Sequence, residues 1–176
     1  LVTKAHFDKV KGYVDLGVDE GADLVADGRD LVVDGHEEGY FLGPCLFDRV
    51  TAGMRIYEEE IFGPVLCVVR AESEEQAMQL IDDHEYGNGT CIFTRDGEAA
   101  RYFADNIKVG MVGINVPLPV PVAYHSFGGW KRSLFGDLYA YGPDSVRFYT
   151  RRKTITQRWP SGGVREKAQF SFPGRQ

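Results

Sequence analysis

Three consecutive carboxylates, Glu58 to Glu60, stand directly before an apolar run in the stretch EEEIFGPVLCVV. A surface loop needs only one or two acids for solubility, so a ligand-binding role has to be weighed here. A carboxylate is purely a hydrogen-bond acceptor with two oxygens, which suits a ligand that presents two neighbouring hydroxyl groups. The residue types alone nevertheless favour a surface acid at Glu60 and a core side chain at Phe62.

The cysteines and histidines offer no second site of obvious chemistry. The three cysteines, Cys45, Cys67 and Cys91, include no Cys-x-x-Cys pair, which indicates free and buried thiols in a reducing cytosol. Cys67 and Cys91 lie within apolar segments, where the pKa of a thiol is raised and its access is poor. The four histidines are scattered without ligand spacing, so we expect no metal site.

Composition limits the partners. The chain has 176 residues, 43% of them hydrophobic, enough for one domain with a core. No stretch reaches the ~20 apolar residues of a membrane span, so we expect a soluble, cytoplasmic protein or a piece of one, with no membrane partner. Residues 147–176 contain eight Lys and Arg and one acid, but the net charge of the whole chain is −6. We therefore expect no nucleic acid partner for this segment, but a strand that pairs with another subunit or stays solvated.

The hydrophobic pattern predicts the elements that position these residues. A helix is predicted from Thr3 to Gly17, with Gly17 as its stop. A short strand in EGADLVADGR and an extended GYFLGPCLFDRV, with Pro44 at an edge or irregularity, follow it. Beyond Glu58 the pattern becomes regular, because three apolar strands alternate with two helices.

The three predicted strands are PVLCVVR, TCIFTR and MVGIN, and the helices between them are capped by Ser73 and Asp96. PVLCVVR is continuously apolar, as in a strand that is buried on both faces of a parallel sheet. Strand, helix, strand, helix, strand with short links predicts the α/β class, with a parallel βαβαβ sheet.

Two segments after the last strand are of interest. Residues 116–137 are rich in Pro and Gly and lie where ligands gather in open sheets, so they form a candidate pocket wall; an ordinary surface crossing is the alternative. FYTRRKTITQRW alternates but has no apolar face, which favours an edge strand that another chain covers. We predict a catalytic-domain portion at 1–147, an oligomerisation strand at 148–160 and a flexible tail at 161–176.

EEEIFGPVL resembles the Glu-Ile-Phe-Gly-Pro signature of the NAD(P)-dependent aldehyde dehydrogenase superfamily. GYFLGPCLF, the Tyr86-Gly87 step, IFTRD, VGINV and SFGGWKRS follow in the expected order, so the resemblance extends from residue 1 to about residue 160. YGNGTCIFTRDG and INVPLPVPVAYHSFGGWKRSLFGD look like the methylmalonate-semialdehyde dehydrogenase branch, which acylates coenzyme A.

The resemblance implies roles for three residues. Glu60 falls at the glutamate that accepts hydrogen bonds from the nicotinamide ribose of NAD, and Phe62 at the aromatic residue beside the nicotinamide ring. Phe127 falls at an aromatic residue of the aldehyde pocket. Glu58 and Glu59 receive no role and are interpreted as solvated.

Lys131 and Arg132 follow the same motif. They could meet an anionic substrate or a phosphate of coenzyme A, but salt bridging or solvation is the favoured interpretation.

The catalytic centre of the family is not found in this sequence. Its chemistry needs a cysteine thiolate that attacks the aldehyde, after which hydride passes to NAD and the thioester is released to water or coenzyme A. None of the three cysteines matches that nucleophile, and no Gly-x-Gly-x-x-Gly is present. The resemblance therefore implies a C-terminal portion of a larger enzyme, with no catalytic residue in this chain and no activity alone.

The complete enzyme that the resemblance implies is a homo-oligomer, a dimer or tetramer whose subunits are joined through residues 148–160. It would oxidise methylmalonate or malonate semialdehyde with decarboxylation, using NAD as cofactor and coenzyme A as co-substrate. A free-standing, non-catalytic assembly or regulatory domain and a fragment that serves another aldehyde are the alternatives.

Overall fold

A computed structural model describes residues 1–157 and residue 159. The helices are α1 Lys4–Asp19, α2 Arg55–Glu58, α3 Glu74–Asp83, α4 Gly97–Asn106 and α5 Ser145–Tyr149, the last preceded by a 3-10 turn, Gly142–Asp144. The strands are β1 Asp23–Ala26, β2 Cys45–Asp48, β3 Val65–Cys67, β4 Tyr86–Gly87, β5 Gly89–Ile92, β6 Met111–Ile114 and β7 Trp130–Lys131. None of the helices in this part of the chain has the length and apolar character needed to cross a bilayer.

Helix α1 begins as predicted but ends later. Thr3 is the N-cap, and its hydroxyl accepts a hydrogen bond from the backbone N–H of His6 at 3.2 Å. The predicted stop at Gly17 is wrong, because the helix continues to Asp19 and the left-handed residue that follows is Gly21 (φ 92°). Gly17 serves packing, since a Cβ there would lie 2.7 Å from the ring of Phe47. Its lack of a side chain lets α1 approach the sheet closely.

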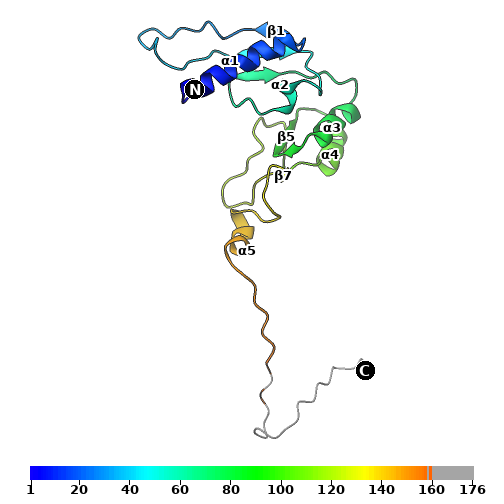
Figure 1. Ribbon diagram of the computed structural model, residues 1–176. Coiled ribbons are helices and arrows are strands. Elements are labelled where there is room, and N and C mark those ends of the chain that lie inside the picture. The colour runs from blue at the N-terminus through cyan, green and yellow to red at the C-terminus, as the bar shows by residue number, and fades with distance from the viewer. Residues whose placement is uncertain (158, 160–176) are drawn as a thin grey trace.

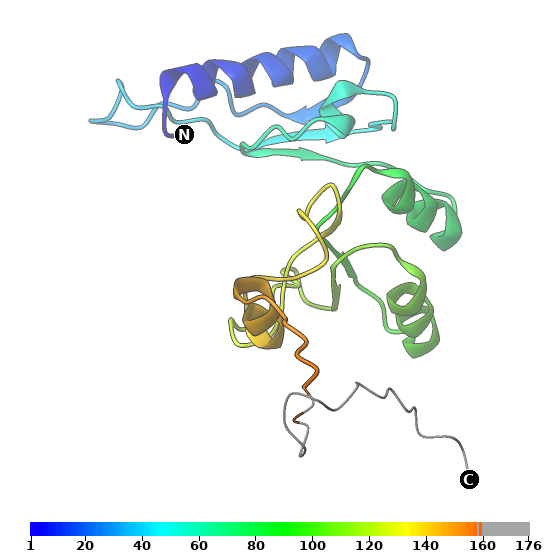
Figure 2. The same ribbon diagram turned by 60° about the horizontal axis from the view of Figure 1, so that its bottom comes forward.

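The first packed layer is α1 on a three-stranded sheet (Figures 1 and 2). In this sheet β2 is central, antiparallel to β1 and parallel to β3, with Cys45 opposite Val65. Pro44 therefore precedes a central strand, where its missing N–H breaks no ladder hydrogen bond. The buried core of this unit is formed by Val10, Tyr13, Val14, Ala22, Cys45, Phe47, Val50, Ile56 and Ile61.

The second packed layer joins α3 and α4 to the parallel pair β5–β6 (Figure 2). Both predicted caps are confirmed: the Ser73 hydroxyl accepts from the N–H of Gln76 at 3.2 Å, and the Asp96 carboxylate accepts from the N–H of Glu98 at 2.8 Å. The buried cluster here is Met78, Phe103, Ile107 and Val109.

The continuous βαβαβ sheet is not formed among the described residues. β5 and β6 are parallel, with α4 between them in the sequence, but β3 pairs with β2. Burial of PVLCVVR on both faces was also a wrong prediction, because Leu66 is 63% exposed. In this structure one face of β3 meets the first core and no described element covers the other. The α/β class holds, but the helices and strands form two smaller units.

The chain after β6 contains little regular structure. β7 pairs with β4. The sequence predicts a short helix over residues 144–150 as well as a strand from Phe148, and α5 confirms the helix, so Phe148 and Tyr149 do not begin a strand. Residues 150–157 are exposed and run away from the body in Figure 1 without a strand partner among the described residues. A strand needs a neighbour to satisfy its backbone groups, so the subunit-bridging strand stays a prediction. The predicted flexible tail, 161–176, lies outside the described residues.

Candidate functional site

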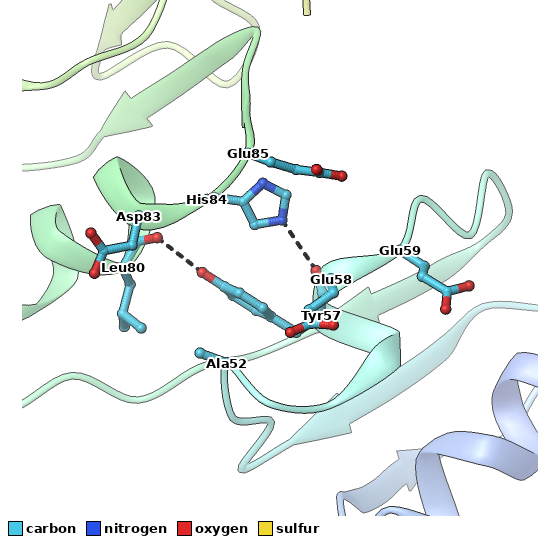
Figure 3. A pocket seen from close by; sticks show the side chains of 8 residues that line it. All are labelled: Ala52, Tyr57, Glu58, Glu59, Leu80, Asp83, His84 and Glu85. Carbon is cyan, nitrogen blue, oxygen red and sulfur yellow. Dashed lines mark hydrogen bonds between the residues drawn. The ribbon is translucent and has the colours of Figure 1, made fainter. Parts of the chain in front are cut away.

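Glu60 lies on an open cleft of about 470 Å³ between two parts of the chain. Residues 57–60, at the end of α2, form one side, and His84, Tyr86, Asn88 and Ser133 form the other. A second hollow of about 540 Å³ adjoins the first and shares residues 57–59 and His84 with it (Figure 3). The size is within the range of small-molecule sites, although the lining is more polar than is usual for them.

Tyr57 and His84 fix the geometry between these hollows. The Tyr57 hydroxyl donates to the carbonyl of Leu80 at 3.0 Å, and His84 Nε2 lies 3.4 Å from the carbonyl of Tyr57 (Figure 3). Their rings meet edge to face, with centroids 5.3 Å apart. Partial burial raises the pKa of Tyr57. These contacts connect the α2 side of the cleft to the end of α3.

Glu59 is not the solvated acid that the sequence suggested. Arg55 Nε and Nη2 donate to its two oxygens at 2.7 and 3.3 Å, and the Tyr13 hydroxyl donates to Oε2. These hydrogen bonds, those of Arg55 first, lower the pKa of Glu59. The bond to Glu59 also raises the pKa of Tyr13, so the phenol keeps the proton that it donates. Glu58, in contrast, is exposed as interpreted.

Like Glu58, Glu60 has free acceptor oxygens. Its side chain is exposed and makes no hydrogen bond or ion pair within residues 1–157. An unpaired carboxylate on a ligand-sized cleft fits a group that donates two hydrogen bonds, such as a vicinal diol.

Phe62 is a solvent-exposed aromatic residue in a strained backbone conformation. It is 77% exposed and has φ 58°, which is rare for a bulky residue and costs about 1–2 kcal/mol. Its carbonyl accepts a hydrogen bond from His6 Nε2 at 2.8 Å. The next residue, Gly63, fits against Val10, because a Cβ would lie 2.6 Å from that side chain. The ring is therefore presented outward by a backbone that α1 holds, as a ring-stacking wall requires.

Phe127 occupies a different place. It is half-buried and stacks on Tyr141, with centroids 4.8 Å apart and planes 18° from parallel. It lines neither of the two hollows around Tyr57. Phe62 lines neither hollow either, but it is two residues from Glu60, whereas Phe127 lies in a separate segment.

Lys131 and Arg132 are engaged within the fold. Lys131 Nζ donates to the carbonyls at the end of α3, those of Ile81, Asp82 and His84, at 2.9 to 3.0 Å. A cation at a helix C-terminus also meets the negative end of the helix dipole. Arg132 pairs with Glu85 and lies over the ring of Tyr86. Salt bridging is confirmed for Arg132, whereas no sequence pattern indicated the capping role of Lys131.

The three cysteines are free, and their surroundings do not resemble those of a nucleophile. Cys45 is 2% exposed, and burial raises the pKa of Cys67. Cys91 is half-buried on β5. Residues 1–157 bring together no cluster of three His, Cys, Asp or Glu side chains arranged to hold a metal ion.

The chain belongs to the aldehyde dehydrogenase family, whose sequence profile matches residues 1–155. It is 75% identical to a malonate-semialdehyde dehydrogenase of Pseudomonas aeruginosa over 173 residues, which are 98% of this chain and 35% of that protein. The fold is also similar to the folds of solved structures that carry the name methylmalonate-semialdehyde dehydrogenase.

A crystal structure of methylmalonate-semialdehyde dehydrogenase from Oceanimonas doudoroffii matches with 69% identity and a TM-score of 0.86, over 94% of this chain and 34% of that one. A structure assigned as methylmalonate-semialdehyde dehydrogenase from Sinorhizobium meliloti 1021, complexed with NAD, matches with 60% identity and a TM-score of 0.87, over 92% and 33%. The chain therefore spans about a third of the length of the relatives that it matches.

Proposed function

We propose that this chain is the C-terminal portion of an NAD-dependent aldehyde dehydrogenase and supplies one wall of the cofactor site. The observation that carries the proposal is the free Glu60 carboxylate on a ligand-sized cleft, two residues from an exposed and backbone-strained Phe62. In this role Glu60 accepts hydrogen bonds from the ribose hydroxyls and Phe62 backs the nicotinamide ring. Bound NAD supplies the hydride acceptor of the reaction.

The substrate follows from the relatives. We assign malonate or methylmalonate semialdehyde as the aldehyde, because relatives that this chain matches carry these names. We also propose that the oxidation proceeds with decarboxylation and with coenzyme A as acyl acceptor. Phe127 is assigned to the aldehyde pocket. Lys131 and Arg132 are not assigned to an anionic ligand, because backbone carbonyls and Glu85 already occupy them.

The remaining parts of the proposal concern the whole enzyme. This chain contains no nucleophile and is inactive alone, and it assembles as a cytoplasmic homo-oligomer through residues 148–160. The basic and exposed character of residues 150–157, which have no strand partner among the described residues, supports such a contact, because an unpaired strand edge can pair with another chain.

Glu60→Gln in the full-length enzyme tests the cofactor role. The amide keeps one acceptor but introduces a donor against the ribose hydroxyls, so we expect a raised KM for NAD or a lowered kcat, with the melting temperature and the oligomer unchanged. Glu38→Gln is the matched control, because Glu38 is also exposed but lines neither hollow. Unaltered kinetics for Glu60→Gln would remove this residue from the site.

Turnover assays test the reaction. The full-length enzyme should reduce NAD with malonate or methylmalonate semialdehyde and release an acyl-coenzyme A and carbon dioxide. The 176-residue chain alone should reduce no NAD at any coenzyme A concentration. Turnover by the isolated chain would contradict the proposal and direct attention to Cys45, Cys67 and Cys91.

A further inference from the structure

One face of α1 contacts residues 59–63, the segment that contains Glu60 and Phe62, at three points. His6, Val10 and Tyr13 are spaced by four and three residues, so they share a face of the helix. His6 Nε2 binds the carbonyl of Phe62 at 2.8 Å, Val10 packs against Gly63, and the Tyr13 hydroxyl donates to Glu59. The contacted residues lie on either side of Glu60 in the sequence, and none of the three contacts involves the Glu60 carboxylate.

We propose that His6 and Tyr13 are positioning residues that fix residues 59–63 on α1 before NAD binds, so that Glu60 and Phe62 are already oriented for the cofactor. The proposal rests on the proposed role of Glu60 in NAD binding. Neither residue needs to touch the cofactor, because each acts through the backbone that connects Glu59 to Gly63.

Tyr13 acts through Glu59. Tyr13 is 8% exposed, and its hydroxyl shares the Glu59 carboxylate with the guanidinium of Arg55. The backbone of Glu59 is extended (φ −97°, ψ 140°), and Glu59 and Glu60 both line the cleft. Anchoring the Glu59 carboxylate to α1 therefore fixes the backbone from which the Glu60 side chain projects.

His6 acts through Phe62. A carbonyl oxygen can only accept, so Nε2 of His6 carries the hydrogen of their 2.8 Å contact. Phe62 has φ 58°, an unfavourable conformation that the surrounding contacts must stabilise. The His6 hydrogen bond and the close fit of Gly63 on Val10 supply these contacts on both sides of the strained peptide unit. Without the donor, the ring of Phe62 loses its fixed outward direction.

A double-mutant cycle in the full-length enzyme separates positioning from general stability. Tyr13→Phe removes only the hydroxyl, and we expect NAD to bind roughly three- to tenfold more weakly, the change expected for one hydrogen bond. In a Glu60→Ala background the same substitution should change the NAD dissociation constant by less than about twofold, because effects that pass through a shared group are not additive. A purely structural loss would be equal in both backgrounds.

The matched control is Tyr102→Phe. Tyr102 lies on α4 and is 49% exposed, and its hydroxyl bonds to no other residue of the described part of the chain. This variant should bind NAD as the wild type does. Melting temperatures of every variant, measured without NAD, show whether the assembly is intact.

A second series keeps the inference testable if Tyr13→Phe fails to fold. His6→Leu removes the donor, and we expect a higher KM for NAD with a smaller change in kcat, whereas His6→Gln retains an N–H and should recover most of the affinity. The inference is overturned if Glu60→Ala weakens NAD binding but His6→Leu and Tyr13→Phe do not, or if Tyr13→Phe has the same effect in both backgrounds. If Glu60→Ala itself leaves NAD binding unchanged, the proposed cofactor role fails instead.

Discussion

Two candidate binding segments of this chain are held in different ways. Residues 59–63 lie on α1 and next to a core of nine buried side chains. Phe127 belongs to the long segment after β6, and no buried hydrophobic residue of the described chain lies beyond Met111. Its ring is supported mainly by its stack on Tyr141.

The difference indicates that the proposed cofactor wall is already formed within this chain, whereas the proposed aldehyde-pocket residue is less firmly held. Helix packing and hydrogen bonds preset the proposed cofactor wall. The proposed aldehyde-pocket aromatic depends on loop contacts, including Gly142 (φ 67°), where a Cβ would lie 2.2 Å from the backbone nitrogen of Ser126. Changes near α1 should therefore cost stability and NAD affinity together, whereas changes near Phe127 should cost less stability and affect the aldehyde but not NAD.

The largest effect is expected for Phe47→Ala. Phe47 is 0% exposed at the centre of the first core, so the substitution should reduce the free energy of unfolding by about 3–5 kcal/mol. Urea unfolding of the full-length protein measures the loss. Phe93→Ala is the matched control, because Phe93 is 66% exposed and its removal should cost less than about 0.5 kcal/mol. Similar losses of unfolding free energy for both variants would show that Phe47 does not belong to a stabilising core.

Gly63→Ala should follow with a loss of about 1–3 kcal/mol, because the added methyl group overlaps Val10. The displaced segment carries Glu60 and Phe62, so the NAD dissociation constant, measured by calorimetric titration, should rise as well. Gly53→Ala provides the comparison, since a Cβ at Gly53 meets nothing within 4 Å. Full NAD affinity in a destabilised Gly63→Ala enzyme would separate packing from cofactor binding.

Phe127→Ala should have a smaller effect on stability, about 1 kcal/mol from the lost stack on Tyr141. Steady-state kinetics should show a higher KM for the aldehyde with an unchanged KM for NAD. Tyr141→Ala should move the same constant in the same direction, because it removes the support of the ring. An effect of Phe127→Ala on NAD alone would reverse the proposed assignment of the two segments.

The smallest expected effect concerns pH. The side chain of Arg70 and the backbone N–H of Arg49 bind Asp48 and lower its pKa from the ordinary 3.8 to about 2. Because the folded-state pKa is depressed, this contribution to stability is present above about pH 4 and is lost as the pH falls towards 2. Arg70 is 71% exposed, so solvent screening keeps the contribution small.

Acid titration of the melting temperature checks this pair. Asp48→Asn should flatten the decline between pH 4 and pH 2. An identical acid profile for Asp48→Asn and the wild type would show that the pair is not maintained in solution.

Much of the secondary structure could be predicted from the sequence, because helix caps and apolar runs depend on residues close together in the chain. Thr3, Ser73 and Asp96 cap helices as their types indicate, and the apolar runs form strands. Which strands pair was predicted poorly, because β3 carries only an apolar pattern and nothing in that pattern specifies β2 as its neighbour. Gly17 was interpreted as a stop for a related reason, since its tight contact with Phe47 spans 30 residues.

The site was predicted only as far as the family motif extends. Glu60 and Phe62 were singled out by the signature, but the anchoring of Glu59 by Tyr13, 46 residues away, has no sequence signal. The spacing of Arg55 and Glu59, four residues apart, was a readable signal of an ion pair. The spacing of His6, Val10 and Tyr13 indicates a shared helix face, but the segment that this face meets depends on the fold.

The most direct measurement is a crystal structure of the full-length enzyme with NAD bound. We expect both Glu60 carboxylate oxygens to lie within about 3 Å of the nicotinamide ribose hydroxyls and the ring of Phe62 to lie against the nicotinamide. A Glu60 side chain that faces bulk water, far from the bound nucleotide, would contradict it.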